Sequence, residues 1–417
     1  MSKARVQELL RREPVPDAAA AEERAWQVIS TAYAERIPAP PAGRGWRLAV
    51  VLAGATILAA LLLSPAGAAV RDWIHDVVTG EGDAAPALTS LPASGELLVE
   101  SELGPWIVQE DGSKRLIGAY GDAAFSPHGR YLAVADGREL AAVVADADAV
   151  GQPAGTPHWT IDAPQHVSDP AWAPSGVRVA YRSGEQLRAV SGDGKGDRAI
   201  AGPIASVSPV WKPLSAHEEA CVDAATGIAS CAANVLAWVD AGRRVHIVDT
   251  DSGRSLLRHA VEPFPGEITD LAWSPDGHRL VVLGNEFAVV LRPDGSFATK
   301  LLAGGVAAAY SPKGDRVAVV ERQYRPGGVH SVVSLVTNGA AGSPLKRLYG
   351  GPGQLTDLTW SPDGRWLLVG YPGADQWVFI PVGHGGHLHA VAGIGDEFDA
   401  GGGTSGRFPR VSGWIDG

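Results

Sequence analysis

Cysteine is scarce in this chain. Cys221 and Cys231 are the only two cysteines among 417 residues, and both lie in one short stretch. A zinc site of cysteines and histidines would need a second Cys/His pair at ligand spacing, and none follows. We therefore expect the two residues to form a disulfide in an oxidising compartment, with metal binding as the alternative. The closed loop is short, so the disulfide would add roughly 2 to 3 kcal/mol of stability.

Motifs for catalysis and for phosphate binding are also missing. The chain has no Gly-x-Ser-x-Gly nucleophile elbow. The glycine-rich stretch 192–197 lacks the Lys-Ser/Thr ending of a phosphate-binding loop and the length of an EF-hand, so it is interpreted as a hairpin turn. His384, His387 and His389 do not have a strong metal-ligand spacing, and we expect them in an exposed turn. The sequence thus predicts that the protein is not an enzyme and uses no cofactor or metal.

Clustered positive charge is the third absence. The net charge is −11, although the first 47 residues carry eight Lys and Arg side chains against six acids. The remainder of the chain therefore stands at −13. Because phosphate binding requires clustered cations, this balance argues against a nucleic-acid partner.

What the chain does contain is a repeated five-residue marker. The stretch Trp273–Gly277, which is Trp-Ser-Pro-Asp-Gly, returns unchanged at Trp360–Gly364. The aromatic residue ends a strand, the proline cannot donate a ladder hydrogen bond, and Asp-Gly reverses the chain. Short apolar runs rich in β-branched residues follow the markers and predict buried strands. Relaxed copies begin at Phe125, Trp172 and Tyr310, and a degenerate copy begins at Trp211.

The spacing of the markers predicts a ring of four-stranded units. Neighbouring marker aromatics are roughly 40 to 50 residues apart, which is typical of a β-propeller blade. The interval from Trp211 to Trp273 is longer, because an insertion at 214–234 holds both cysteines. Six markers begin six blades, while residues 97–118 supply three strands of a seventh and residues 410–417 supply its first strand. The sequence therefore predicts an all-β, seven-bladed β-propeller that the C-terminal strand closes.

The marker followed by arginine and an apolar strand, as in Arg279–Leu283, resembles the TolB-type, WD-repeat-like β-propellers of bacteria. The resemblance covers residues 97–417, and the propeller domain is assigned to 96–417. It implies a platform for binding or interaction. The resemblance does not imply a catalytic site.

An apolar segment at 48–70 precedes the propeller and has no charged residue. As a helix it would be about 34 Å long, enough to span a hydrocarbon core of roughly 30 Å. Three arginines lie shortly before it and only Arg71 follows closely, so the positive-inside rule places the N-terminus in the cytoplasm. The expected result is a single-pass protein of the cell membrane, with a linker at 71–95 and an extracytoplasmic propeller. A cleaved signal peptide, with Ala66-Gly67-Ala68 as its cleavage site, is the competing interpretation.

The predicted cytoplasmic segment, 1–47, contains one candidate helix at 17–37. Ile29 and Tyr33 belong to an apolar stripe on this helix, opposite most of its charged residues. The stripe is explained either by a cytoplasmic partner or by a helix that lies on the inner membrane surface.

Connections between blades, and between the second and third strands of a blade, open on one face of a propeller. That face usually carries ligands. Two functions remain: an extracytoplasmic platform for a protein or cell-envelope ligand, or a transmembrane regulator with the layout of an anti-sigma factor but without its zinc motif. The residues expected on this possible binding face are Tyr120, His166, Phe264, Tyr324, Arg325 and Phe398.

Overall fold

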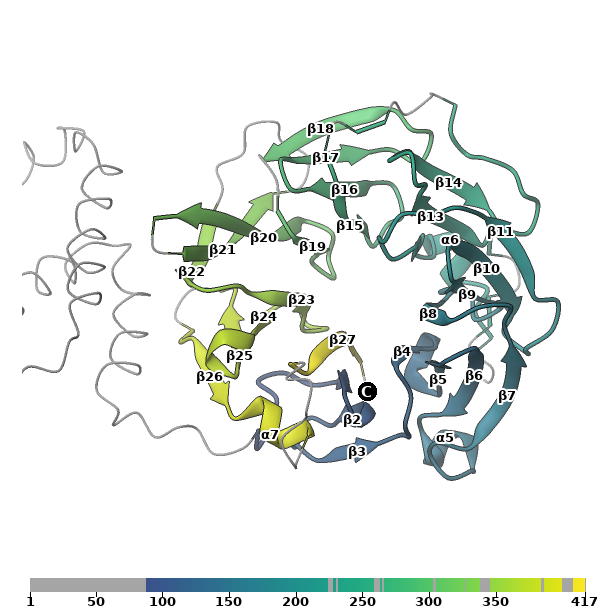
Figure 1. Ribbon diagram of the computed structural model, residues 1–417, viewed down its shortest axis with the longest axis horizontal. Coiled ribbons are helices and arrows are strands. Elements are labelled where there is room, and N and C mark those ends of the chain that lie inside the picture. The colour runs from purple at the N-terminus through teal and green to yellow at the C-terminus, as the bar shows by residue number, and fades with distance from the viewer. Residues whose placement is uncertain are drawn as a thin grey trace, which may run out of the picture. The chain divides into compact units, whose positions relative to one another are not determined.

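Seven antiparallel sheets stand around a common axis, and each sheet is one blade (Figure 1). In the part of the chain that the structure describes, six sheets have four strands and one has three. The predicted all-β, seven-bladed propeller is thus confirmed. The computed structural model describes residues 88–223, 228–229, 232–258, 263–264, 266–302, 305–326, 328–337, 346–383, 386–399 and 408–416.

The segments predicted to lie in the cytoplasm, 1–47, and in the membrane, 48–70, fall outside the described residues. Among the helices that are described, none is long and apolar enough to cross a membrane. These helices are α5 (Ala147–Val150), α6 (Ala216–Glu219) and α7 (Ile394–Phe398), with two 3-10 turns, η1 (Pro127–Gly129) and η2 (Pro372–Ala374).

The blades are numbered from the one that holds both ends of the propeller, and their strands are given from the axis outward. Blade 1 is β27 (Arg410–Ile415), β1 (Glu96–Ser101), β2 (Gly104–Val108) and β3 (Lys114–Leu116). Blade 2 is β4 (Asp122–Phe125), β5 (Tyr131–Asp136), β6 (Glu139–Val144) and β7 (Pro157–Asp162). Blade 3 is β8 (Val167–Trp172), β9 (Arg178–Ser183), β10 (Gln186–Ser191) and β11 (Arg198–Ala201).

The remaining blades follow the same order from the axis outward. Blade 4 is β12 (Val210–Trp211), β13 (Val235–Val239) and β14 (Val245–Asp249). Blade 5 is β15 (Ile268–Trp273), β16 (Leu280–Gly284), β17 (Phe287–Leu291) and β18 (Phe297–Leu302). Blade 6 is β19 (Ala307–Tyr310), β20 (Arg316–Arg325), β21 (Gly328–Thr337) and β22 (Lys346–Pro352). Blade 7 is β23 (Thr356–Trp360), β24 (Trp366–Tyr371), β25 (Gln376–Pro381) and β26 (His389–Ala392).

The C-terminal strand closes the ring as predicted. β27 is the inner strand of blade 1 and pairs antiparallel with β1, with Leu97 opposite Trp414. The guanidinium of Arg410 adds two bonds to Glu100, from Nε at 3.0 Å and from Nη2 at 2.6 Å. Blade 1 therefore joins residues about three hundred positions apart, and β1 is paired on both sides.

The hydrophobic core is divided among the seven seams between neighbouring blades. In β16, Leu280 and Val282 pack toward blade 4, whereas Val281 and Leu283 pack toward blade 6. Successive side chains of a strand point to opposite faces, so a middle strand has two buried faces. This is why the apolar runs after the markers are continuous rather than alternating.

The side chain of the marker serine satisfies a backbone N–H at the start of the strand that follows the turn. Ser274 Oγ accepts from the N–H of Arg279 (3.0 Å) and donates to Asp276 Oδ1 (2.5 Å). Gly277 closes the turn, and its backbone N–H donates to Ser274 O (2.8 Å). Its φ of +66° is a backbone conformation that favours glycine. The second full copy repeats these contacts at Ser361. The predicted turn chemistry is confirmed.

The marker tryptophan also acts between blades, which its local sequence does not reveal. In three blades its indole Nε1 donates to a carbonyl on the preceding blade. That carbonyl always belongs to the residue just before the preceding marker aromatic. The three bonds are Trp211 to Ala171 (2.9 Å), Trp273 to Val210 (3.2 Å) and Trp360 to Ala309 (3.1 Å).

The segment before β1 belongs to the propeller, which corrects the predicted linker boundary at residue 95. Leu88, Leu91 and Ala93 are buried in the seam between blades 7 and 1. The N–H of Leu91 donates to Glu110 O (2.8 Å). The apolar side chains of this segment explain the difference, because they bury against the seam instead of remaining in a solvated tether.

Candidate functional site

One face of the ring holds the start of every inner strand, together with the turns between the second and third strands of each blade. We call it the loop face. Antiparallel order places the markers at the opposite end of the inner strands. Four of the six predicted binding residues belong to connections between blades, as expected from their positions between strands, whereas Tyr324 and Arg325 lie at the end of β20.

The predicted binding residues differ in exposure. His166, between β7 and β8, is exposed, whereas Tyr120, between β3 and β4, is half-buried. Burial is the main cause that raises the pKa of Tyr120. Phe264 stacks on Phe287 with ring centroids 4.9 Å apart, so much of its surface is used within the protein. Tyr324 has the most exposed large apolar side chain of the described residues, at 79%.

Phe398 is fully buried, so its predicted place on an exposed binding surface is wrong. It lies at the end of α7, in contact with Trp106 (ring centroids 5.8 Å apart) and Trp377 (5.3 Å). Lys114 lies over its ring and pairs with the neighbouring Glu397. The Gly-rich sequence around Phe398 suggested a solvated loop, but a short helix folds the ring into the seam between blades 7 and 1.

Tyr324 and Arg325 lie on a β-hairpin rather than on the long loop that the sequence predicted. β20 and β21 have ten residues each and pair along their full length, up to Arg325 opposite Gly328. The second strands of the other blades have five or six residues. The inner strand β19 pairs with β20 only as far as Val320. We call residues 321–326 and 328–332, which continue past this pair, the arm (Figure 1, β20 and β21).

A set of carboxylates at the start of the inner strands is a feature that the sequence interpretation missed. Each of the four accepts a hydrogen bond from the next blade, either from its inner strand or, for Ser208, from just before that strand, and so ties one blade to the next. The signal was available, because each aspartate stands three residues before a marker aromatic. The bonds run from Asp169 N to Asp122 (3.2 Å), Ser208 Oγ to Asp169 (2.7 Å), Ala308 N to Asp270 (2.9 Å) and Val411 N to Asp357 (3.3 Å).

Two of these carboxylates have strongly shifted titration. Burial raises the pKa of Asp270 to about 6, against two backbone N–H donors that lower it. Burial likewise raises the pKa of Asp357 to about 6, and Arg410 opposes this effect. In each group, Oδ2 accepts from a backbone N–H of the neighbouring inner strand, so the arrangement is that of structural acceptors.

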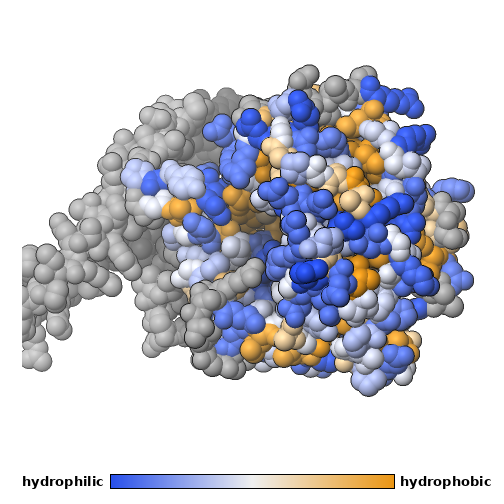
Figure 2. Space-filling model, turned by 45° about the vertical axis from the view of Figure 1, so that its right-hand side comes forward, coloured by the Kyte–Doolittle hydropathy of each residue, from blue (hydrophilic) through white to orange (hydrophobic). Residues whose placement is uncertain are grey.

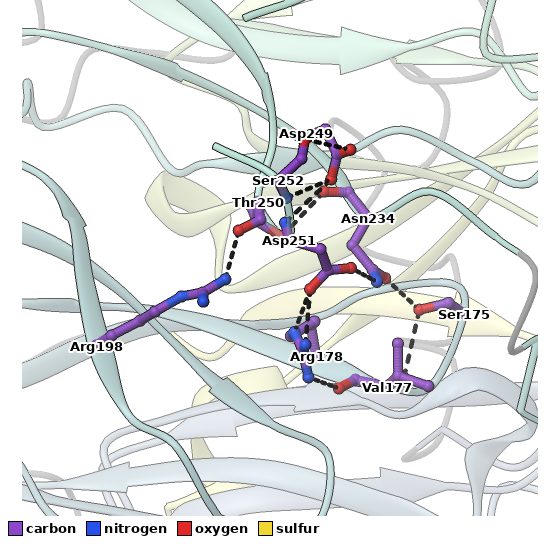
Figure 3. Close-up of polar contacts among 9 residues, drawn as sticks. All are labelled: Ser175, Val177, Arg178, Arg198, Asn234, Asp249, Thr250, Asp251 and Ser252. Atoms are coloured by element: carbon purple, nitrogen blue, oxygen red, sulfur yellow. Dashed lines mark hydrogen bonds and ion pairs between the residues drawn. The ribbon is translucent and has the colours of Figure 1, made fainter. Parts of the chain in front are cut away.

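A second polar cluster fills the seam between blades 3 and 4 (Figure 3). Asp251 accepts from Arg178 Nε (2.8 Å) and Nη2 (2.7 Å) and from Asn234 Nδ2 (2.5 Å). Arg198 donates to the carbonyl of Thr250, also across the seam. Blade 4 has no regular outer strand in its described residues, and these contacts cross-link the seam beside the gap.

A cavity of about 330 Å³ adjoins this cluster, and three cations line it. Arg178 is held by Asp251, Lys195 by Asp193 (3.0 Å) and Arg198 by a carbonyl. Each cation therefore already has a partner within the protein. The cations that line the cavity are thus used in contacts within the protein, which argues against an anion site.

The remaining predicted site residues are divided between described and undescribed parts of the chain. Cys221 is described and is not a free thiol, but Cys231 lies outside the described residues, so their pairing stays a prediction. His384 is likewise outside, while His389 packs on Phe379 at 6.0 Å between ring centroids. Over the described ranges, no three His, Cys, Asp or Glu side chains are grouped to hold a metal ion.

The described surface carries few large apolar side chains. In the view of Figure 2, hydrophilic residues cover much of the surface and hydrophobic residues occur in separate groups. Apart from Tyr324 on the arm, the exposed large hydrophobic residues are Leu103, Leu116, Ile228 and Phe297.

Comparison with known proteins identifies the repeat type. The family model for the WD domain, G-beta repeat, matches residues 342–380, which run from blade 6 into the third strand of blade 7. A segment of 64 residues is 38% identical to Actin-interacting protein 1 of Drosophila melanogaster. That match covers 13% of this chain and only 10% of the fly protein.

Solved propellers resemble the chain in fold. A Kluyveromyces lactis Hsv2 structure with complete loop 6CD superposes with a TM-score of 0.50 at 11% identity, covering 71% of this chain and 94% of that one. A variant with this loop replaced by a Gly-Ser linker gives a TM-score of 0.50 at 10% identity, covering 71% and 93%. At such identities the likeness concerns the fold alone. With the repeat match and the seven sheets, it supports a WD-repeat-like propeller.

Proposed function

We propose that this chain is a membrane-anchored β-propeller that presents its loop face outside the cytoplasm and there binds a protein or a cell-envelope ligand, without catalysis. The fold supports an interaction platform, because a WD-repeat-like ring offers rigid, loop-rich faces for recognition. The anchor is proposed from the apolar segment 48–70 and the arginines before it.

The arm is the observation that carries this proposal. Blade 6 alone among the described blades extends its second and third strands to ten residues, and the extension continues beyond the inner strand. It holds Tyr324 in solvent, where burying an aromatic ring against a partner would be favourable. Beyond Val320 the extension has no partner in the inner strand β19, which favours a role in recognition.

Affinity capture from membranes tests the proposal directly. The full-length chain in mild detergent should retain a defined partner, and a chain shortened across the arm, with 321–332 replaced by a two-residue turn, should retain less of it. The thermal midpoint of the shortened chain is the control for folding, and it should equal that of the unaltered chain. Equal recovery by both chains would remove the arm from the proposed function.

A transmembrane regulator is the second candidate, and the stripe around Ile29 and Tyr33 favours it. If a cytoplasmic partner binds this stripe, replacing both residues by Asp should abolish its capture by the intact protein. The variant should still be anchored and folded. Recovery of nothing above background with the unaltered segment 1–47 would eliminate this candidate and leave the first proposal in place.

A further inference from the structure

The arm has one sheet edge that no described strand covers. On the outer side, β22 pairs with β21 up to His330 opposite Pro352, and the N–H of Gly353 then donates to Val329 O (2.7 Å). On the inner side, β19 ends at Ala307 opposite Val320, where Val306 N–H donates to Val320 O (2.8 Å). Among the described residues, the inner edge of β20 therefore has no strand partner beyond Val320.

The direction of the backbone groups follows from the alternation of the ladder. Val320 directs its backbone groups toward β19, so Arg322 and Tyr324 direct theirs the same way. The odd-numbered residues, such as Gln323 opposite His330, bond to β21 within the hairpin. Two N–H groups and two carbonyls thus form a short open edge of the kind that accepts an added strand.

The side chains on this part of the arm indicate what the added strand contains. Arg322 and Tyr324 lie on the same face of the hairpin, with Ser331 and Val329 as their cross-strand neighbours. The Nε of Arg322 is buried and has no acceptor within the described part of the chain. Ser331 does not serve it, because its Oγ already donates to Gly353 O (2.9 Å) and accepts from Leu355 N (3.1 Å).

We infer that the inner edge of the arm binds an extended acidic segment of the partner as an additional β-strand. Main-chain bonds to Arg322 and Tyr324 hold the segment, a carboxylate of the partner pairs with the Arg322 guanidinium, and an apolar residue of the partner covers Tyr324. Arginine and tyrosine are the residue types that carry binding energy at protein interfaces. This inference rests on the proposed function, since it specifies the partner of the same face.

Random twelve-residue peptides displayed on phage, selected against the full-length chain, test this inference. We expect the enriched peptides to carry Asp or Glu together with β-branched or aromatic residues. Synthetic copies of them are then titrated by fluorescence anisotropy against the protein and its variants. Binding should weaken as the salt concentration rises, because part of the attraction is between charges.

Four variants separate the contributions of backbone and side chains. Tyr324→Pro removes an N–H of the open edge while leaving the bonds of the hairpin intact, whereas Tyr324→Ala removes only the ring. Arg322→Glu reverses the proposed contact, and Arg325→Glu makes the same charge change on the opposite face of the hairpin. We expect Tyr324→Pro and Arg322→Glu to weaken binding about tenfold or more, and Arg325→Glu to change it by less than about threefold. Unchanged thermal midpoints establish that the variants are folded.

Three other results would overturn the inference. Peptides without an acidic excess, peptides that bind equally well to Tyr324→Pro and Arg322→Glu, or a selection that enriches no sequence would each do so. A dimer seen in sedimentation and lost in Tyr324→Pro would show that a second copy occupies the edge instead. None of these results decides the proposed function, which is judged by the capture of a partner from membranes.

Discussion

At the scale of single residues, two kinds of side chain hold neighbouring blades together. Three marker tryptophans donate to carbonyls of the preceding blade, and four aspartates, each three residues before a marker aromatic, accept hydrogen bonds from the next blade. Both are buried polar contacts, whose loss leaves an unsatisfied partner. Single substitutions at these positions therefore test the seams directly.

Trp273→Phe should destabilise the propeller through one lost hydrogen bond. The substitution leaves the Val210 carbonyl without its indole donor, at a cost of about 1 to 2 kcal/mol in the free energy of unfolding. Trp172→Phe is the matched control, because the Nε1 of Trp172 is buried and has no acceptor among the described residues. Urea denaturation of both variants measures the difference. Equal losses in the two variants would contradict a stabilising role for the bond.

Asp270 should make stability depend on pH in the direction opposite to that of an ordinary surface carboxylate. Its pKa is raised from 3.8 to about 6 in the folded protein, so between these values the folded state binds more protons than the unfolded state. The free energy of unfolding therefore falls as the pH rises through this window. Relative to Asp270→Asn, which does not titrate, the natural protein should lose about 1 to 3 kcal/mol between pH 4 and pH 7.

Exposed Asp276 supplies the control for this measurement. Burial acts to raise its pKa, but hydrogen bonds from Ser274 and from the N–H of His278 outweigh burial and lower it. Its contribution to stability is therefore present above the ordinary pKa and is lost as the pH falls. Relative to Asp276→Asn, the natural protein should gain stability as the pH rises. The same sign for both positions would refute the assignment.

At the scale of secondary structure, two features distinguish this ring. The strand β27 closes it, and the β20–β21 hairpin extends beyond the inner strand of its blade. The first is a requirement of the fold, since without β27 blade 1 would expose an unpaired β1 edge and lose Trp414 from its seam. The second adds nothing to the closure of the ring, which is why the proposed function is assigned to it.

Deletion of residues 410–417 from the full chain should destabilise the whole propeller. The loss of an inner strand and of the Arg410–Glu100 pair should lower the thermal midpoint by more than about 10 °C or prevent folding. Deletion of Asp416 and Gly417 alone, which leaves β27 intact, should have little effect. Differential scanning fluorimetry of the three chains decides the matter, and three equal midpoints would be incompatible with closure by β27.

At the scale of the whole molecule, the apolar segment 48–70 predicts that the propeller is anchored to a membrane. The arginine asymmetry around 48–70 predicts a cytoplasmic N-terminus and an external propeller. A reporter active only in the cytoplasm should work when fused after residue 40, and one active only outside should work after residue 80. The reverse pattern would refute the topology, and a soluble mature form that begins near Ala69 would show a cleaved signal peptide instead.

The sequence by itself determined the ring, the number of blades and the closing strand. These properties follow from local chemistry: Ser-Pro stops a ladder, Asp-Gly turns the chain, and short apolar runs rich in β-branched residues between such turns are typical of buried strands. The hairpin at Tyr324, the burial of Phe398 and the blade-to-blade bonds of Trp273 and Asp270 were decided by the tertiary structure. The bonds join residues that are 63 positions apart for Trp273 and Val210 and 38 apart for Asp270 and Ala308. No local pattern specifies which distant group a side chain meets, because that depends on how neighbouring blades pack once the ring has closed.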